Sequence, residues 1–180
     1  MISPQFLEKC QSGDEESIRT LIRSYQRPVF QLALSILDDD TGQPDSVVQQ
    51  AAEATRQTFM TALDRLNRFR DEIPFETWLY GIAIEVSKKR FRSYKRTQWL
   101  NRLFNRSPEP ALDQDAASRD GDDPLWQAVR KLDLKYRLPV VLRYFHNMST
   151  GEIARLLHLS EGTVHARLDA AREKIAGTIE

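Results

Sequence analysis

Between positions 86 and 106 the sequence carries a run of basic side chains. This stretch holds eight lysines and arginines and no acidic residue, and aromatic residues alternate with the cations. Cations attract the phosphates of nucleic acid and aromatic rings stack on exposed bases, so the stretch favours contact with nucleic acid. The alternative is a solvated helical face whose aromatic rings belong to the core. The cations are Lys88, Lys89, Arg90, Arg92, Lys95, Arg96, Arg102 and Arg106, and the aromatic residues are Phe91, Tyr94, Trp99 and Phe104.

The last 33 residues predict two short helices joined by a tight turn. Ser149 and Glu152 fit a capping box at the start of the first helix, and Ser160 is a suitable cap for the second. This layout is typical of a helix-turn-helix, whose second helix enters the major groove of DNA by its N-terminal end. An ordinary helical hairpin is the alternative, but the small Ala154 permits the close helix crossing that the DNA-binding motif needs. The side chains expected to point outward are Glu161, Thr163, His165, Ala166, Arg167 and Asp169.

Residues that could support catalysis or hold a metal are few and scattered. The only histidines are His146, His158 and His165, and the only cysteine is Cys10. A lone cysteine forms neither an internal disulfide nor a structural zinc site, and the glycines form no phosphate-cradling loop. We therefore expect no catalytic residue, no metal and no cofactor, and the sequence disfavours an enzyme.

Apolar residues recur at spacings of three and four almost throughout the chain, which predicts an all-α fold. Pro4 and the acidic residues 14–16 mark the starts of the first two helices, and Gly13 should separate them. Pro28 should kink or split the second helix. A third helix is expected to run to about Asn67, and Pro74 should open a fourth that leads into the basic run. Further helices are expected from Pro124, over 136–146, over 149–157 and from 161 to about 178.

Charge divides the neutral chain into blocks of opposite sign. Residues 1–85 have a net charge of −6, residues 86–106 of +8, residues 107–124 of −5 and residues 125–180 of +3. Residues 107–123 are polar, aperiodic and contain two prolines, so they predict a flexible acidic linker crossed by few contacts. We expect helical domains over 1–106 and 124–180. No run reaches the ~18 to 20 apolar residues of a membrane span, so we expect no membrane insertion and a cytoplasmic protein.

With these residues in place, the sequence resembles the extracytoplasmic-function (ECF) sigma factors of bacterial RNA polymerase. The resemblance is strongest over Leu138–Phe145, Glu152–Ala154 and Ser160–Leu168, which are similar to sigma region four. Phe75–Ala83 is similar to the promoter-melting helix of region two. Two matches in the family's order make a chance likeness implausible.

The resemblance implies a transcription initiation factor that directs RNA polymerase core enzyme to promoters and assists promoter melting. Region two would hold the polymerase and read the minus-ten element as a single strand, and region four would read the minus-thirty-five element as a duplex. The acidic linker would pass through the polymerase's active-site and RNA-exit channels, and regulation would come from an anti-sigma factor. The residues implied for core polymerase are Glu53, Arg56, Gln57 and Phe59. Those implied for minus-ten DNA are Arg70, Trp78, Tyr80, Glu85, Lys88, Lys89 and Arg92, and those for minus-thirty-five DNA are Ser160, Glu161, Thr163, His165, Arg167 and Arg172.

The sequence departs from the family pattern at several of these positions. Only one of two usual acids, Glu53, is present on the polymerase-binding helix, since Arg56 and Gln57 stand where a glutamine and a glutamate are usual. Glu85 stands where an asparagine is usual and Lys89 where an aspartate is usual. Because a carboxylate can accept a hydrogen bond from cytosine, we expect Glu85 to help select the minus-ten sequence, with Lys88, Lys89 and Arg92 offsetting its charge. In region four, His165, Ala166 and Ala170 replace a common lysine, serine and arginine, which reduces the number of phosphate contacts.

Two alternatives share the same motifs. A sigma-like decoy would bind an anti-sigma factor without driving transcription. A stand-alone helix-turn-helix repressor would bind duplex DNA as a dimer without polymerase. Run-off transcription distinguishes the decoy, which would give no transcript, from a sigma factor. A gel shift of the isolated protein distinguishes the repressor, which would bind duplex DNA without polymerase.

Overall fold

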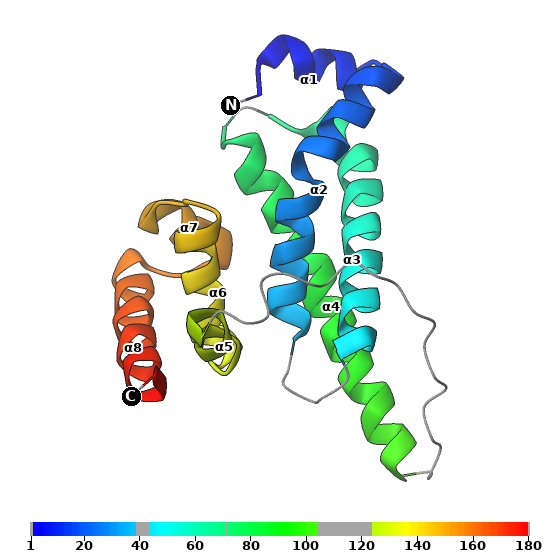
Figure 1. Cartoon of the computed structure of the whole chain (residues 1–180). Helices are drawn as coiled ribbons and strands as arrows, with labels where there is room; N and C mark the ends of the chain where they lie inside the picture. The colour runs from blue at the N-terminus through cyan, green and yellow to red at the C-terminus, as the bar shows by residue number, and fades with distance from the viewer. Residues whose placement is uncertain (1, 39–43, 71, 104–123, 180) are drawn as a thin grey trace.

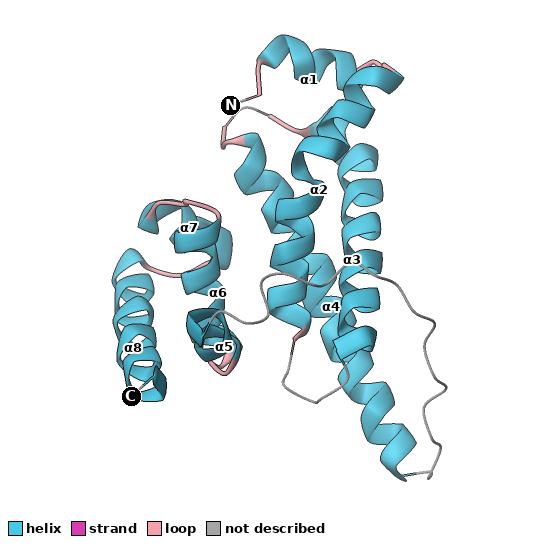
Figure 2. Ribbon diagram, in the orientation of Figure 1, coloured by secondary structure: helices cyan, strands magenta, loops and turns pink. Residues whose placement is uncertain are grey.

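The computed structural model describes residues 2–38, 44–70, 72–103 and 124–179 (Figure 1). All regular elements in these ranges are helical, and they form two units (Figure 2). The expected all-α class is therefore confirmed. The expected linker over 107–123 lies outside the described residues. None of the described helices combines the length and apolar character that a membrane span requires.

The N-terminal unit consists of α1 (Pro4–Gln11), α2 (Glu15–Leu37), α3 (Pro44–Arg65), the short η1 (Leu66–Arg68) and α4 (Phe75–Leu103). Asp14 caps α2 by accepting a hydrogen bond from the Ser17 backbone N–H at 2.9 Å. Gly13 separates α1 from α2 with a φ of 85°, a left-handed conformation that glycine adopts without strain. The three long helices α2, α3 and α4 pack against one another, so the basic run that follows the core of α4 is a continuation of a packed helix.

Of the two expected effects of Pro28, a kink or a split of the second helix, the split is wrong. α2 runs unbroken through Pro28 from Glu15 to Leu37. A proline inside a helix removes one backbone hydrogen bond. The residues that follow, Val29, Leu32 and Ile36, are fully buried, and this burial offsets that loss.

The predicted amphipathic faces supply the core of the N-terminal unit. Leu21, Ala51, Leu66, Leu79 and Ala83 are among its buried residues. Trp78, which the sequence places on the same stripe as Leu79, is only partly buried and packs at the edge of the cluster. The core thus leaves the Trp78 side chain of α4 partly accessible.

The C-terminal unit consists of α5 (Pro124–Arg130), α6 (Leu134–Val140), η2 (Val141–Phe145), α7 (Thr150–Leu157) and α8 (Glu161–Ile179). α8 packs against α5, α6 and α7. The expected helix over 136–146 is formed as α6 followed by η2, a wider π-helical turn in which the His146 N–H donates to the Val141 carbonyl at 3.2 Å. Pro139 precedes this turn and lacks an N–H to donate.

The two units touch, through fewer pairs of elements than hold each unit together. α2 packs against α6 and η2, and α4 packs against α7 (Figure 1). Arg130 of the C-terminal unit forms an ion pair with Asp38 at the end of α2. Buried residues of both units form one continuous apolar cluster. The sequence predicts the apolar side of each helix but not which helices share it.

Candidate nucleic-acid interface

The helix-turn-helix forms with the caps that the sequence predicts. The Glu152 N–H donates to Ser149 Oγ at 3.3 Å, and the Ser149 N–H donates to Glu152 Oε2 at 2.7 Å. The Ser149 hydroxyl also donates to Glu152 Oε2 at 2.6 Å, and this bond, together with that from the Ser149 N–H, lowers the pKa of the Glu152 carboxyl. His158 ends α7 in the left-handed conformation, with a φ of 55°, and the Leu159 N–H closes the turn on the Ala154 carbonyl at 2.9 Å. Ile153 and Val164 are fully buried between α7 and α8.

The N-terminal end of α8 is open to a ligand. Ser160 Oγ accepts the Thr163 N–H at 3.1 Å and thereby caps the helix. Glu161 and His165 are exposed. This arrangement presents a capped helix end with two accessible polar side chains, which is the geometry that direct base readout requires.

Of the two arginines assigned to the same helix, Arg167 points away from His165, and Arg172 is on the side of His165 but is held by other side chains. At 100° per residue, Arg167 lies about 200° around α8 from His165, on the side that approaches Lys88 of α4. Arg172 donates to Tyr144 Oη at 3.0 Å and pairs with Asp169 at 3.2 Å. The six minus-thirty-five residues predicted from the sequence are therefore not brought to a single face.

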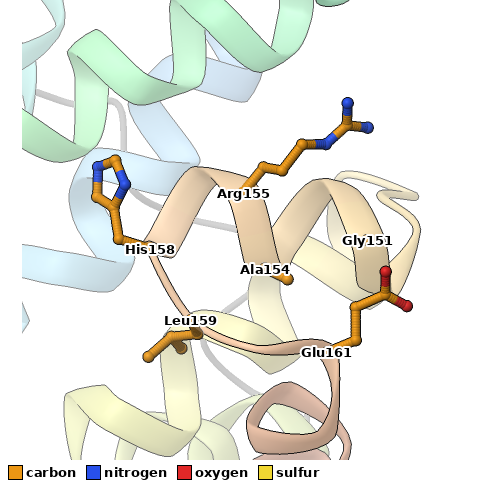
Figure 3. Close-up of a pocket in the computed structure, with 6 residues that line it drawn as sticks. All are labelled: Gly151, Ala154, Arg155, His158, Leu159 and Glu161. Carbon is orange, nitrogen blue, oxygen red and sulfur yellow. The ribbon is translucent and has the colours of Figure 1, made fainter.

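An open groove of about 720 Å³ lies beside the exposed end of α8 (Figure 3). Glu161 reaches across it toward α7, where its Oε1 lies 3.2 Å from the position that a Cβ on Gly151 would occupy. Arg155 points outward from α7, and the sequence analysis did not select it (Figure 3). The signal that could have identified it is its place on the first helix, which crosses the DNA backbone in this motif. The groove is lined by Gly151, Ala154, Arg155, His158, Leu159 and Glu161.

One stripe of α4 faces outward and carries Trp78, Glu85 and Arg92 at steps of seven residues. The Trp78 ring packs against Phe69 and Phe75, with centroid separations of 5.1 and 5.5 Å. Glu85 is exposed and accepts a hydrogen bond from Arg65 Nη1 of α3 at 3.3 Å. The sequence analysis expected Lys88, Lys89 and Arg92 to offset the charge of Glu85. The ion-pair partner that the structure shows is Arg65 of α3, which that expectation did not include.

Two other predicted minus-ten residues lie on a different side of α4. The Tyr80 side chain is buried, and its ring lies 4.7 Å from that of His146 in the C-terminal unit. Burial, reinforced by the Glu76 carboxylate, raises the pKa of Tyr80 to about 12. Burial, followed by the charges of Arg92 and Arg167, lowers the pKa of Lys88. Tyr80 and Lys88 thus face the other unit rather than the stripe of Trp78.

The remaining residues predicted to bind minus-ten DNA, Lys89 and Arg70, differ in how their side chains are held. Lys89 is exposed on α4. Arg70 Nη1 donates to the backbone carbonyls of Asn67 and Phe69 at 3.3 and 3.2 Å, which fixes its guanidinium at the turn before α4. The side chains of Tyr94, Lys95 and Trp99 and all of Phe104 lie outside the described residues.

The predicted polymerase-binding residues lie on α3. Arg56 makes a two-pronged contact with Glu53, with Nε–Oε2 and Nη2–Oε1 distances of 2.8 and 2.6 Å, which lowers the pKa of the Glu53 carboxyl. Gln57 is exposed beside this pair. Phe59 is only 6% exposed and belongs to the core, so its ring does not reach this surface. Met60 is 57% exposed and lies 2.9 Å from Arg56 Nη1; residue spacing alone did not reveal this exposure.

Within the described ranges, no group of three or more His, Cys, Asp or Glu side chains is placed to hold a metal ion. Cys10 is buried, and burial followed by the charge of Asp14 raises the pKa of its thiol. The chemistry that the site offers is therefore charge, hydrogen bonding and aromatic contact.

Comparison with known proteins identifies both units. The family model of sigma-70 region 2 matches residues 21–97, and that of sigma-70 region 4 matches residues 122–175. The ECF RNA polymerase sigma factor SigW of Bacillus subtilis is 25% identical over 186 residues, covering 97% of this chain and 95% of SigW. The RNA polymerase sigma-H factor of Pseudomonas aeruginosa is 27% identical over 183 residues, covering 95% of this chain and 90% of sigma-H.

Two solved structures share the fold. The sigma factor RpoE of Bartonella quintana, in complex with the anti-sigma factor NepR, superposes with a TM-score of 0.67 at 17% identity, covering 89% of this chain and 94% of RpoE. CnrH, in complex with the cytosolic domain of CnrY, superposes with a TM-score of 0.65 at 22% identity, covering 96% of this chain and 93% of CnrH.

Proposed function

We propose, from the premise that this chain belongs to the ECF family of RNA polymerase sigma factors, a division of promoter recognition between its two units. The chain is a transcription initiation factor whose partners are RNA polymerase core enzyme and promoter DNA. The division rests on one observation, that the same chain carries a capped helix-turn-helix and a region-two helix with a partly accessible Trp78 and exposed cations. We extend the proposal to domain boundaries at 1–106 and 124–180, joined by residues 107–123.

The C-terminal unit binds the duplex minus-thirty-five element through the start of α8. Glu161 and His165 are the exposed side chains that enter the major groove, and Ser160 and Thr163 fix the helix end. Arg155 is added to this surface as a phosphate contact from α7. Arg167 and Arg172 contribute phosphate contacts from the flanks of α8.

The N-terminal unit binds the minus-ten element through α4. Trp78, Glu85, Lys89 and Arg92 form the accessible stripe, with the cations positioned for phosphate and the ring for a base. Arg70 supports the turn that precedes this stripe. Tyr80 and Lys88 join it only when the C-terminal unit is elsewhere.

α3 binds the core polymerase through Glu53, Arg56 and Gln57, and Met60 supplies apolar contact at the same surface. Phe59 supports this helix from the core side. The RpoE structure contains an anti-sigma factor, and a partner of that kind is proposed for this chain. The relatives are sigma factors rather than enzymes, and we propose that the chain works in the cytoplasm, where RNA polymerase is found.

The test is transcription by reconstituted holoenzyme. Purified core enzyme is mixed with the full chain and a library of fragments with randomised minus-ten and minus-thirty-five elements, and the run-off products are sequenced. We expect the chain to enrich a two-part sequence that core enzyme alone does not transcribe. Binding of an anti-sigma factor without any transcript would indicate a decoy. A specific gel shift of duplex DNA by the isolated chain, without any transcript, would indicate a repressor.

A further inference from the structure

Arg90 belongs to the basic run, yet it lies on the side of α4 that faces the core. At 100° per residue, it falls within about 20° of Leu79 around the helix, on the side that packs against α2 and α3. The exposed cations Lys89, Arg92 and Arg96 lie about 100–160° away from it. The Arg90 side chain is only 27% exposed. Arg90 therefore continues the core-facing stripe of α4 rather than its exposed stripe.

The Arg90 guanidinium reaches across to α3 and binds Gln50. Its Nε and Nη2 atoms donate to Gln50 Oε1 at 3.2 and 3.0 Å. Because both donations come from one rigid plane, they fix the orientation of the guanidinium as well as its position. The two residues are 40 positions apart in the sequence, so this contact joins the later part of α4 to the early part of α3.

The remaining nitrogen of Arg90 points toward the acid of the predicted polymerase surface. Arg90 Nη1 lies 4.0 Å from Glu53 Oε1, and the same oxygen accepts a hydrogen bond from Arg56 Nη2 at 2.6 Å. The hydrogen bond from Arg56 is the main cause of the lowered pKa of Glu53, and the charge of Arg90 adds to it. Glu53 is thus held between a cation of its own helix and a cation of α4.

The residues that Arg90 contacts share one side of α3 with a third predicted docking residue. Gln50, Glu53 and Gln57 follow one another at spacings of three and four, which places them along the same side of the helix. Gln57 is exposed, and Glu53 is 38% exposed. To bind a DNA phosphate, Arg90 would have to give up its bonds to this side of α3.

We propose that Arg90 is a positioning residue of the polymerase-docking surface, which holds Gln50 and Glu53 of α3 in place from α4 and makes no contact with minus-ten DNA. This assignment rests on the proposed function, in which α3 binds core polymerase. It separates one member of the basic run from the cations that meet nucleic acid. The docking surface is then shaped by α3 and α4 together, although α3 supplies its contact residues.

The positioning role is tested by the affinity of the full chain for core polymerase in a labelled-core titration. Arg90→Met keeps an unbranched stem and a similar helix propensity but removes every donor. It should raise the Kd at least about fivefold, the scale of one lost hydrogen bond. Arg96→Met makes the same change at an exposed position of α4 and should leave the Kd unchanged. Arg90→Lys restores a cation and a donor, so it should return the Kd to within about twofold of the wild-type value.

A double-mutant cycle shows whether Arg90 acts through α3. Gln50→Ala removes the acceptor and should raise the Kd by about the same factor as Arg90→Met. The double variant should raise the Kd no further than the stronger single variant, because both substitutions remove the same bridge. Circular dichroism and urea unfolding of each variant distinguish this loss from a loss of folding. If Arg90→Met does not fold, Gln50→Ala and Arg90→Lys still test the bridge.

The absence of a DNA contact is tested with holoenzyme at saturating core polymerase. Promoter binding is measured over a salt series, in which each lost phosphate contact lowers the slope by about one. Arg90→Met should keep the wild-type slope. Arg92→Met, on the exposed stripe of α4, should lower the slope by about one.

Separate results overturn separate parts of the proposal. A wild-type Kd for Arg90→Met, together with a raised Kd for Glu53→Lys, would overturn the role of Arg90 and leave α3 as the docking surface. Additive losses in the double variant would make Arg90 a direct polymerase contact instead of a positioning residue. A salt slope lowered by about one in Arg90→Met would place Arg90 on DNA. Failure of the proposed function would appear instead as an unchanged Kd for Glu53→Lys and no run-off transcript, and the role of Arg90 would fall with it.

Discussion

At the scale of single residues, Glu85 connects two of the three long helices of the N-terminal unit, α3 and α4. Its ion pair with Arg65 restrains a carboxylate on the stripe that also carries Trp78. Glu85→Asn should change the base preferred in the minus-ten element without weakening polymerase binding, because an amide both donates and accepts hydrogen bonds. Selection from a library randomised at minus ten measures this change. Arg65→Ala, which keeps the carboxylate and removes its partner, should retain the preferred base. Identical selected sequences for wild type and Glu85→Asn would make Glu85 a bystander.

Substitutions of His165 and of Arg167 should affect DNA binding in different ways, although the two residues are only two positions apart. His165 is exposed at the open end of α8, so His165→Ala should cost about 1–3 kcal/mol at one base position and relax specificity there. Arg167 lies on the opposite side of the helix, so Arg167→Ala should weaken all sequences alike and reduce the salt slope by about one. Binding by holoenzyme to a set of single-base variants over a salt series separates these effects. The same loss of specificity from both substitutions would contradict their placement on different faces.

Glu53 is the acid whose charge matters most for the polymerase surface. Glu53→Lys places a cation beside Arg56 and Arg90 and should raise the Kd for core enzyme by at least ~10-fold, since like charges at an interface cost several kcal/mol. Glu16→Lys makes the same change at an exposed position of α2 and serves as the control. Affinity measured by a labelled-core titration should separate the two variants. Equal affinities, with unchanged circular dichroism, would move the docking surface away from α3.

At the scale of elements, the capping box determines how firmly α7 is held. Ser149→Ala should lower the free energy of unfolding of the C-terminal unit by about 1 kcal/mol, whereas Ser149→Asp, another good cap, should retain most of it. The Glu152 pKa is lowered in the folded state, so its stabilisation is present above the ordinary value of 4.5 and is lost as the pH falls through the lowered value. Urea unfolding at pH 7 and below pH 4 should therefore show that the free energy of unfolding falls less at acid pH for Ser149→Ala than for wild type. An equal acid loss in both would show that the box contributes nothing to the pH dependence.

Most helices could be predicted because their signals are local. Caps at Asp14, Ser149 and Ser160 and the spacing of apolar residues lie within a few positions of the elements they define. Contacts between helices leave no such local signal. The pairing of Arg65 with Glu85 joins residues 20 apart, and the burial of Phe59 depends on the helices that surround α3. The unbroken course of α2 through Pro28 likewise depends on core packing rather than on the proline alone.

At the scale of the whole molecule, the sequence indicated two units but not their contact. Charge blocks and the composition of residues 107–123 predict where the units divide, and the region 2 and region 4 family matches cover residues 21–97 and 122–175. The contact between the units joins Tyr80 of α4 to His146, which lies far along the chain. The resemblance implies a DNA contact for Tyr80 and no role for His146, so only the three-dimensional arrangement reveals that they pack together.

The central claim, that this chain is a sigma factor whose two units read two promoter elements, is tested most directly by run-off transcription from the enriched promoter. The predicted result is a discrete transcript that requires both core enzyme and this chain. Altering either promoter element should abolish the transcript, and Glu53→Lys should reduce it while Glu16→Lys does not. A chain that binds core enzyme yet gives no transcript from any member of the randomised library would contradict the account.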